Sequence, residues 1–298
     1  MKYDVLILGG GSAGMSAAIY CKRANLSACI IDNNISGGRP LGYLEIENYL
    51  GLGRTDTFSM IEKFKEHVAL FDIPVYEFQE IESIDLQNKV VKTSENTFEG
   101  KAIIIATGSS PRKLGVNGEE EFVGKGVHYC AICDGPMYKD KVVAVVGGGN
   151  SACEEALGLS KIAKQVYIIE YTDKLNADAI TVEQINNAEN IEVHTGCAVD
   201  EIIGDNKVTD ILFHQVNNTE NTYEYCVDGI FPYIGMTANS DLFDLEKDHG
   251  FIITNDDMET SIKGVYAVGD VRSKNYRQVI TAVADGAIAG IAVRKYLK

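Results

Sequence analysis

Short apolar runs and a glycine-rich turn alternate along the first part of the chain. Tyr3–Leu8 has the continuous apolar pattern of a short buried strand, and Met15–Ala24 is a run of mostly small residues that predicts a helix. A second apolar run, Ala28–Ile31, predicts another strand, and the turn at 9–14 connects the first strand to the helix. Strand, turn, helix and strand in this order predict a parallel βαβ unit.

This turn carries a glycine spacing that is typical of dinucleotide binding. Gly9 permits the tight turn, Gly11 lets a pyrophosphate approach the backbone, and Gly14 allows close packing of the helix. The helix amino terminus offers free N–H groups to the phosphates. Asp32 ends the second strand about 20 residues later, where an acid accepts hydrogen bonds from ribose hydroxyls. A plain structural turn is the alternative, but it leaves the coincidence of all these features unexplained.

The same pattern returns in the middle of the chain. Lys141–Val146 predicts a strand, a second glycine turn occupies 147–152, and Cys153–Ser160 predicts a helix. The next strand, Val166–Ile169, ends on Glu170, which has the spacing that Asp32 has in the first unit. Two nucleotide-binding units in one chain suggest that two dinucleotides meet, as hydride chemistry requires.

The remaining segments complete these two units. Val75–Ile105 and Ile191–Phe231 each follow one unit and alternate polar and apolar residues with the period of a strand. Gly264–Asp270 is one more apolar strand, and Thr281–Leu297 is a long helix of small residues. Since this tail has no third glycine fingerprint, we expect it to complete the first domain. The predicted fold class is α/β, with two Rossmann-like, three-layer ββα dinucleotide-binding domains, the second inserted into the first.

Composition and charge limit the partners. Apolar residues make up 45% and charged residues 23% of the chain, as in an ordinary globular protein. The 43 acids and 27 bases give a net charge of −16, so we expect neither nucleic acid nor a membrane surface as a partner. No apolar run approaches the ~20 residues of a membrane helix, and the start of the chain lacks the pattern of a signal peptide. We therefore expect a cytoplasmic protein.

Two of the seven cysteines form a Cys-x-x-Cys pair, Cys130 and Cys133. A zinc half-site would need two more ligands, but the other cysteines are isolated and His128 is the only histidine nearby, so we expect no metal. If the two cysteines only packed in the protein interior, their Cys-x-x-Cys spacing would be a coincidence. We favour a redox dithiol, because two thiols one helical turn apart can close a disulfide. The adjacent Asp134 could shuttle a proton during thiol–disulfide exchange.

Together these motifs resemble the low-molecular-weight thioredoxin reductases over the whole chain. The segments that carry the resemblance are Gly-Gly-Gly-Ser-Ala-Gly at 9–14, Gly37-Gly38, Glu47-Asn48-Tyr49, Ala106-Thr107-Gly108, Cys130-Ala-Ile-Cys-Asp134, Gly147-Gly-Gly-Asn-Ser-Ala152, Gly269-Asp270 and Arg277-Gln278-Val279. The resemblance implies an FAD-binding domain at 1–114 and 238–298 and a pyridine-nucleotide-type domain with the dithiol at 115–237. It also implies a homodimer and a rotation of one domain against the other.

The resemblance implies roles for single residues as well. Cys133, as the thiol nearer the flavin, would take electrons from it, Cys130 would attack the disulfide of thioredoxin, and Asp134 would be the acid–base partner. The residues implied to bind FAD are Gly9, Gly11, Ser12, Ala13, Gly14, Asp32, Gly38, Asn48, Ala106, Thr107, Gly108, Gly269, Asp270, Arg277, Gln278 and Val279. The second nucleotide site, vestigial or specific for NADH, would use Gly147, Gly149, Asn150, Ala152 and Glu170.

The chain departs from the family pattern at this second nucleotide site. Family members that use NADPH carry a His-Arg-Arg-x-x-x-Arg run that holds the 2′-phosphate, and guanidinium contacts to phosphate are strong. The aligned stretch Glu170–Asn176 has no arginine and begins with an acid. Because a carboxylate repels a phosphate dianion, we expect NADPH to bind poorly.

A second departure lies in a loop that is near the flavin in the family. Arg39–Leu44 replaces the threonine-rich loop that usually follows Gly37-Gly38. Tyr43 in this loop either stacks on the flavin ring or packs within the loop.

Two electron donors remain open. We favour direct reduction of the flavin by ferredoxin, as in a subgroup of thioredoxin-reductase-like flavoproteins from anaerobes that lacks the same arginine run. The alternative is an NADH-dependent reductase in which Glu170 accepts the ribose hydroxyls. A third hypothesis is a non-catalytic, flavin-binding redox sensor. Ferredoxin is acidic, so it would need a basic patch, for which the candidates are Lys22, Arg23, Arg39, Arg54, Arg272, Lys274 and Arg277.

Overall fold

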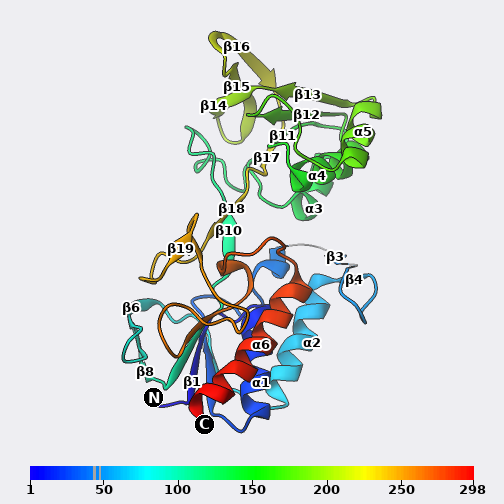
Figure 1. The fold of residues 1–298 in the computed structure, drawn as a ribbon. Coiled ribbons are helices and arrows are strands. Elements are labelled where there is room, and N and C mark those ends of the chain that lie inside the picture. Colours follow the sequence, from blue (N-terminus) through cyan, green and yellow to red (C-terminus); the bar gives the residue numbers. More distant parts are fainter. Residues whose placement is uncertain (43–44, 47) are drawn as a thin grey trace. The chain divides into compact units, whose positions relative to one another are not determined.

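The computed structural model describes residues 1–42, 45–46 and 48–298, and the side chains of Ile132 and Cys133 lie outside this description. The chain divides into two compact units (Figure 1). The first consists of Met1–Ser110 and Thr237–Lys298, and the second, Pro111–Met236, is inserted between these segments.

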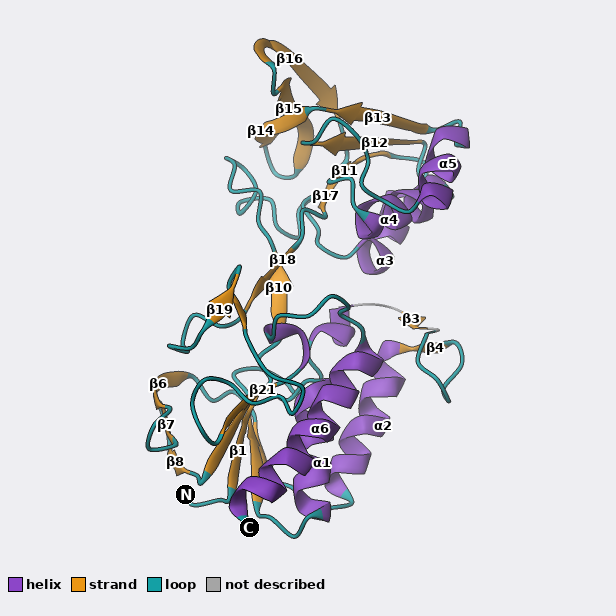
Figure 2. Ribbon diagram, in the orientation of Figure 1, coloured by secondary structure: helices purple, strands orange, loops and turns teal. Residues whose placement is uncertain are grey.

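The first unit is built on a parallel sheet with the strand order β21-β9-β1-β2-β5. These strands are β1 (Val5–Leu8), β2 (Ala28–Ile31), β5 (Val75–Tyr76), β9 (Ala102–Ile105) and β21 (Val265–Ala267). Helices α1 (Ser12–Arg23), α2 (Thr57–Ala69) and α6 (Val279–Leu297) lie together on one face of it (Figure 2). An antiparallel sheet of β6 (Ile81–Asp85), β7 (Val90–Thr93) and β8 (Thr97–Glu99) packs against the other face. Shorter elements are η1 (Arg39–Gly42), β3 (Glu45–Ile46), β4 (Thr55–Asp56), β19 (Lys247–Asp248), β20 (Phe251–Ile252) and η3 (Gly269–Val271).

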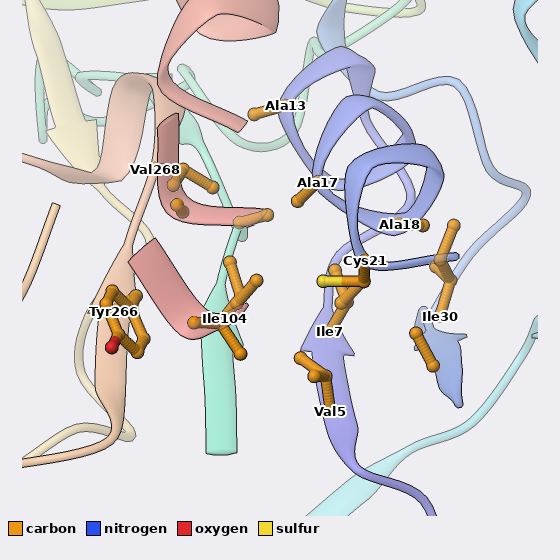
Figure 3. Close-up of a cluster of buried hydrophobic side chains, with 14 of the residues drawn as sticks. Val5, Ile7, Ala13, Ala17, Ala18, Cys21, Ile30, Ile104, Tyr266 and Val268 are labelled. Atoms are coloured by element: carbon orange, nitrogen blue, oxygen red, sulfur yellow. The ribbon is translucent and has the colours of Figure 1, made fainter. Parts of the chain in front are cut away.

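Side chains of the parallel sheet enter two separate cores, because consecutive residues of a strand point to opposite faces. Ile7 packs with small residues of α1 such as Ala17, as Figure 3 shows. Leu6 and Leu8, on the other face, pack with Phe98 of the antiparallel sheet. All five side chains are fully buried. The continuous apolar runs of the sequence thus correspond to strands covered on both faces, which gives three layers.

The second unit repeats this arrangement. Its parallel sheet has the order β13-β12-β11-β17, with β11 (Val142–Val146), β12 (Gln165–Glu170), β13 (Ile191–Thr195) and β17 (Gly229–Pro232). Helices α4 (Asn150–Ser160) and α5 (Ala179–Asn187) pack on one face, and an antiparallel sheet of β14 (Cys197–Gly204), β15 (Val208–Gln215) and β16 (Asn218–Cys226) packs on the other. The short helices α3 (Ala131–Asp134) and η2 (Gly135–Tyr138) precede β11. The predicted α/β class with parallel sheets is therefore present in both units.

The chain crosses between the units at β10 (Ser109–Pro111) and β18 (Met236–Ala238), which pair with each other. The first crossing falls after Ser110, whereas the resemblance implied a boundary after residue 114. The reason is local hydrogen bonding, since the Arg112 N–H donates to the Gly235 carbonyl over 2.9 Å and the Leu114 N–H donates to Glu119 over 2.8 Å.

Helix limits differ from the sequence prediction in an informative way. Helix α1 begins at Ser12 rather than Met15, because Gly11 of the glycine turn is itself the N-cap, and α4 shows the same difference. Helices α2 and α5 were not predicted. A signal for α2 was present, since the Asp56 carboxylate caps the helix by accepting from the Ser59 N–H over 2.7 Å.

Helices α1 and α6 approach each other closely at two glycines. A Cβ on Gly286 would lie 2.1 Å from the Ala13 carbonyl oxygen, and a Cβ on Gly290 would lie 2.6 Å from the Tyr20 Cβ. Both distances are far below van der Waals contact. These glycines therefore set the separation of the helix that follows the first glycine turn from the carboxyl-terminal helix.

Gly286→Ala should lower the free energy of unfolding by about 1–3 kcal/mol, because the added methyl group forces two packed helix backbones apart. Gly158→Ala is the matched control, since this glycine lies inside α4 with no atom within 4 Å of a Cβ. It should be neutral or stabilise by roughly 0.5–1 kcal/mol. Urea denaturation of the two variants measures the difference, and equal effects would contradict the close helix contact.

Candidate active site and nucleotide sites

Four pairs of predicted site residues meet at the carboxyl edge of the first parallel sheet. Gly9 has a φ of 108°, and a Cβ there would lie 2.4 Å from the Ala106 carbonyl oxygen. A Cβ on Gly38 would lie 3.0 Å from the Gly11 Cα, and one on Gly269 would lie 2.9 Å from the Ala13 Cβ. The fourth pair is Asn48 and Gln278, whose side chains are hydrogen-bonded over 3.1 Å. Segments far apart in sequence thus enclose the first glycine turn.

The amino terminus of α1 is suited to bind an anion. Its N-cap, Gly11, makes no side-chain capping bond, and the first turn contains no acid. The Ser12 hydroxyl at this end is buried without a hydrogen-bond partner. Unpaired N–H groups and the positive end of the helix dipole favour phosphate. The turn therefore has the donors that a pyrophosphate would require.

Asp32 lies beside this turn and is held in place by two backbone groups. Its Oδ2 accepts from the Gly10 N–H over 2.6 Å, and its Oδ1 accepts from the Asn34 N–H over 2.9 Å. Each carboxylate oxygen retains a further lone pair. The geometry is the one in which an acid at the end of a strand accepts ribose hydroxyls.

A buried charged cluster follows β21. Asp270 is the second residue of η3. Burial raises the pKa of its carboxyl group, while the neighbouring charges of Lys274, Arg39 and Arg277 oppose this rise. The Asp270 Oδ1 has no hydrogen-bond partner, with the Lys274 Nζ 3.7 Å away. An unsatisfied buried carboxylate oxygen costs free energy unless a ligand completes it. A ligand hydroxyl at this position would supply that hydrogen bond.

Arg277, Gln278 and Val279 form the connection from this cluster into α6. The Arg277 guanidinium lies over the Phe251 ring, 4.0 Å from its centroid, and the Arg277 Nε is buried without a partner. Gln278 caps α6 in a reciprocal arrangement with Thr281, and Val279 is the first residue of the helix. Tyr43 lies outside the described residues.

The second glycine turn has the same backbone geometry as the first. Gly147 has a φ of 124°, and a Cβ there would lie 2.4 Å from the Tyr233 carbonyl oxygen. A Cβ on Gly149, the N-cap of α4, would meet nothing within 4 Å, and Ala152 is fully buried behind it. The Asn150 side chain accepts from the Asp178 N–H over 2.7 Å. The turn has kept the shape of a nucleotide-binding loop.

Glu170 occupies the position in this unit that Asp32 occupies in the first. Its Oε1 accepts from the Thr172 N–H over 2.8 Å, as the Asp32 Oδ1 does from Asn34. A Cβ on Gly148 would lie 2.8 Å from the Glu170 Oε2. The corresponding distance in the first unit, from a Cβ on Gly10 to the Asp32 Oδ2, is 3.0 Å. Glu170 is buried, so the acid is directed at the turn rather than at solvent.

The predicted redox segment begins with Cys130, which is half-buried and disulfide-bonded. The helix α3 starts directly after it, and the Asp134 N–H donates to the Cys130 carbonyl over 3.0 Å. The Ala131 N–H donates to the Tyr233 hydroxyl over 2.8 Å. The prediction for the Cys133 thiol lies outside the described side chains. The free cysteines include Cys21, whose pKa burial raises to about 12, which makes its thiol unreactive.

The structure adds His128 to this segment, a residue considered above only as a metal ligand. Its side chain is buried, and its Nδ1 lies 3.1 Å from the Asp134 Oδ2. A buried histidine two residues before the cysteine pair was visible in the sequence, but nothing in the spacing indicated which residue it would contact. Three of the other four histidines, His67, His194, His214 and His249, also face a carboxylate. The distances are 2.9 Å from the His194 Nε2 to the Glu192 Oε1, 2.7 Å from the His214 Nδ1 to the Asp200 Oδ1, and 3.7 Å from the His249 Nε2 to the Asp248 Oδ1.

Three of the seven candidate cations for a docking patch are not free surface charges. The Lys274 side chain is 9% exposed, and its Nζ lies 3.0 Å from the Asp285 Oδ2. The Arg272 Nη1 lies 3.3 Å from the Asp285 Oδ1, and Arg277 packs over Phe251. Lys22 and Arg23 lie in the last turn of α1 and remain as candidates. The predicted basic patch is therefore smaller than the sequence indicated.

Two searches of the described residues, 1–42, 45–46 and 48–298, gave no result. They contain no group of three or more histidine, cysteine, aspartate or glutamate side chains placed to hold a metal ion. Within the same ranges, no helix has both the length and the apolar character that crossing a membrane requires.

Comparison with known proteins places the chain in a family. A model of the pyridine nucleotide-disulphide oxidoreductases matches residues 3–286. The chain belongs to this family. The thioredoxin reductase of Treponema pallidum (strain Nichols) is 39% identical over 300 residues, which cover 99% of this chain and 97% of that protein. The crystal structure of Lactococcus lactis thioredoxin reductase has a TM-score of 0.89 at 36% identity, with 99% of both chains covered.

A further solved structure is related at lower similarity. A ferredoxin-flavin thioredoxin reductase from Clostridium acetobutylicum has a TM-score of 0.54 at 31% identity, covering 99% of this chain and 98% of that one. The resemblance to the low-molecular-weight thioredoxin reductases, with two dinucleotide-binding domains, is thereby confirmed. As a pyridine nucleotide-disulphide oxidoreductase of this type, the chain is a flavoenzyme with FAD as its cofactor. The first glycine turn, Asp32 and the unsatisfied Asp270 fit such a cofactor.

Asp270→Ala should weaken FAD binding by roughly 10- to 100-fold, since a hydrogen bond to a charged group contributes about 1.5–3 kcal/mol. Titration of the apoprotein with FAD, followed by quenching of flavin fluorescence, measures the change. Asp241→Ala, an exposed aspartate of the same unit, is the control. An Asp270→Ala protein that binds FAD as tightly as the wild type would contradict the assignment of Asp270.

Proposed function

We propose that the chain is a cytoplasmic, homodimeric thioredoxin reductase that transfers electrons from FAD through Cys133 and Cys130 to the disulfide of thioredoxin. The observation that supports this most directly is the disulfide-bonded Cys130 at the start of α3, with the Asp134 carboxyl group in the same short helix. Exposed isoleucines on α6, namely Ile280, Ile288 and Ile291, provide apolar surface for a second copy. The thioredoxin reductases among its relatives act on the substrate that we propose here.

Each group in this site has a role in the proposed reaction. FAD, when bound, accepts electrons from a donor and passes them in pairs to a disulfide. The pyrophosphate would lie at the amino terminus of α1, and the ribose hydroxyls at Asp32. Asp270 would accept a hydrogen bond from a cofactor hydroxyl, and the Arg277–Val279 segment would hold the ring. Asp134 would carry the proton that Cys130 loses and regains.

We infer that the electron donor is NADH. The supporting observation is the close correspondence between Glu170 and Asp32, each buried or half-buried at a strand end and held by the N–H two residues later. A carboxylate at this position accepts the two ribose hydroxyls of NADH and repels the 2′-phosphate of NADPH. The backbone turn next to it is intact, with open space at Gly149.

Ferredoxin is the second candidate donor. It is supported by the similarity to the Clostridium acetobutylicum protein, a ferredoxin-flavin thioredoxin reductase. Charge argues against it, because the net charge is −16 and Arg272, Lys274 and Arg277 are engaged inside the protein. For this reason we place NADH first, although the sequence alone favoured ferredoxin.

Anaerobic mixing of the purified flavoprotein with each donor tests this assignment. NADH should bleach the flavin faster than NADPH at equal concentration, and reduced ferredoxin should not be required. Bleaching by ferredoxin alone would replace the first candidate with the second. Failure of NADH, NADPH and ferredoxin alike would favour the redox sensor.

Glu170→Gln should raise the KM for NADH by about 10-fold or more, because it removes the charge from an acceptor of two ribose hydroxyls. It should also narrow the preference for NADH over NADPH, since the repulsion of the 2′-phosphate is lost. Glu183→Gln, an exposed glutamate on α5, is the control. Unchanged kinetics for Glu170→Gln would mean that Glu170 does not contact the donor.

Cys130→Ser should leave reduction of the flavin intact and abolish turnover of thioredoxin, because the serine hydroxyl is not nucleophilic enough to attack a disulfide. Steady-state reduction of thioredoxin and stopped-flow reduction of the flavin measure the two steps separately. A Cys130→Ser protein that still reduces thioredoxin would overturn the proposed order of the two thiols.

A further inference from the structure

A linear series of three interacting side chains, Asp134, His128 and Tyr138, lies next to the dithiol segment in the second unit. The His128 Nδ1 is 3.1 Å from the Asp134 Oδ2, and the His128 Nε2 is 2.8 Å from the Tyr138 hydroxyl. Both His128 and Tyr138 are buried, with 7% and 5% of their surface exposed, whereas the Asp134 side chain is 32% exposed. The three side chains therefore lead from the buried Tyr138 toward solvent and end at the Asp134 carboxylate.

The His128 ring is fixed from several directions. Its ring stacks on Phe231 at a centroid distance of 5.7 Å and meets the Tyr138 ring edge-on at 5.5 Å. The His128 N–H donates to the Ile230 carbonyl over 3.0 Å, which attaches this residue to β17. A ring held in this way cannot turn away from Asp134 without losing its other contacts.

The hydrogen positions follow from the partners. The Asp134 carboxylate can only accept, so the nitrogen that faces it, Nδ1, carries a hydrogen. Burial, followed by the charges of Asp134 and Asp228, raises the pKa of Tyr138 to about 12. The tyrosine hydroxyl therefore keeps its proton at neutral pH and can donate to Nε2 of a neutral ring. In this tautomer both ring nitrogens are satisfied, and Nδ1–H points at Asp134.

Two other charged groups lie close to this series of side chains, Lys141 and Asp228. Lys141 has its Nζ 5.3 Å from the centroid of the Tyr138 ring. Asp228 contributes to the raised pKa of Tyr138, and its Oδ2 accepts from the Val142 N–H over 3.1 Å. Both groups adjoin Tyr138 at the interior end, so His128 is the partner of the Asp134 carboxylate itself.

We propose that His128 is a positioning residue for thiol–disulfide exchange, which holds the Asp134 Oδ2 so that Oδ1 receives the proton of the Cys130 thiol. This inference rests on the proposed function, because it assumes that Asp134 is the acid–base partner of the dithiol. In general, a hydrogen bond that is donated to a carboxylate favours its charged, proton-accepting form. The hydrogen bond from Nδ1 also prevents the half-exposed side chain from rotating into solvent.

The proton and electron balance of the step is as follows. Asp134 takes the proton of the Cys130 thiol, and the thiolate attacks one sulfur of the thioredoxin disulfide. The new mixed disulfide releases one thioredoxin thiolate, which receives this proton back from Asp134. The Cys133 sulfur then attacks the Cys130 sulfur of the mixed disulfide. This attack closes the enzyme disulfide and releases the second thioredoxin thiolate. The released thiolate takes up the proton of the Cys133 thiol. Thioredoxin gains two electrons and two protons, and the dithiol loses the same number.

Two substitutions of His128 separate positioning from packing. Asparagine places an amide N–H where Nδ1 was, and glutamine places its amide where Nε2 was, so only His128→Asn keeps the donor to Asp134. Both remove the ring and its packing on Phe231. The full-length, FAD-loaded enzyme is reduced anaerobically with dithionite, which needs no physiological donor. Stopped-flow mixing with oxidised thioredoxin then gives the rate of flavin reoxidation as a function of pH.

In His128→Gln the rate should fall by about 10-fold on the acid side of the profile, with the acid limb moved upward by roughly one pH unit. His128→Asn should retain most of the wild-type profile. A purely structural role of His128 would slow both variants alike and leave the position of the acid limb unchanged. That result, or a wild-type profile without an acid limb, would overturn the proposal.

A matched control uses the other histidine–aspartate pair of this unit. His214→Gln makes the same exchange where the His214 Nδ1 faces Asp200, on the antiparallel sheet, and it should leave the pH profile unchanged. If reduced wild-type enzyme passes no electrons to thioredoxin, the proposed function fails. In that case the pH profile of flavin reoxidation, measured for the same variants with a small aromatic disulfide in place of thioredoxin, still tests the role of His128.

Discussion

Close contact between backbone segments at the two glycine turns is the constraint on which both halves of the protein depend. Gly9 and Gly147 each place their α-carbon against a carbonyl oxygen, that of Ala106 in the first unit and that of Tyr233 in the second. Because no side chain fits at these positions, the following helix begins directly above the end of the sheet. The unpaired N–H groups of that helix then point to the carboxyl edge of its sheet. In the first unit Asp32 and Asp270 follow strands that end at this edge, and in the second unit Glu170 ends such a strand.

The two units share this geometry but differ in what surrounds it. In the first, Gly38 and Gly269 pack against the turn, and Asn48 and Gln278 are hydrogen-bonded to each other. The Asp270 Oδ1 is buried there without a hydrogen-bond partner, with the Lys274 Nζ 3.7 Å away, so a ligand hydroxyl would find an open acceptor at this position. In the second, the chemistry is concentrated in one acid, Glu170, where relatives with arginines would hold a phosphate. The negative charge of Glu170 would disfavour a 2′-phosphate at this strand end.

The proposed acid–base role of Asp134 depends on a different physical principle. Asp134 lies in a helix of one turn, which by itself fixes a side chain poorly. The rigidity comes from His128, which belongs to another segment and is held by β17 and by the aromatic rings of Phe231 and Tyr138. A half-exposed carboxylate thereby acquires a defined orientation without being buried, and it remains accessible to a partner protein.

The sequence by itself determined the elements and their order, because strand period, glycine spacing and a terminal acid are local properties that short-range sterics and hydrogen bonding impose. It therefore predicted both βαβ units and the insertion, although it missed α2 and α5. The helical spacing of Met60, Ile61 and Val68, which share the buried face of α2, was a signal that went unused. Contacts between residues far apart in the chain could not be predicted from the sequence. The enclosure of Gly286 by Ala13, the pairing of Lys274 and Arg272 with Asp285, and the attachment of His128 to Asp134 were decided only by the tertiary structure. Each depends on which side chains packing brings together, and packing depends on the whole chain rather than on any window of it.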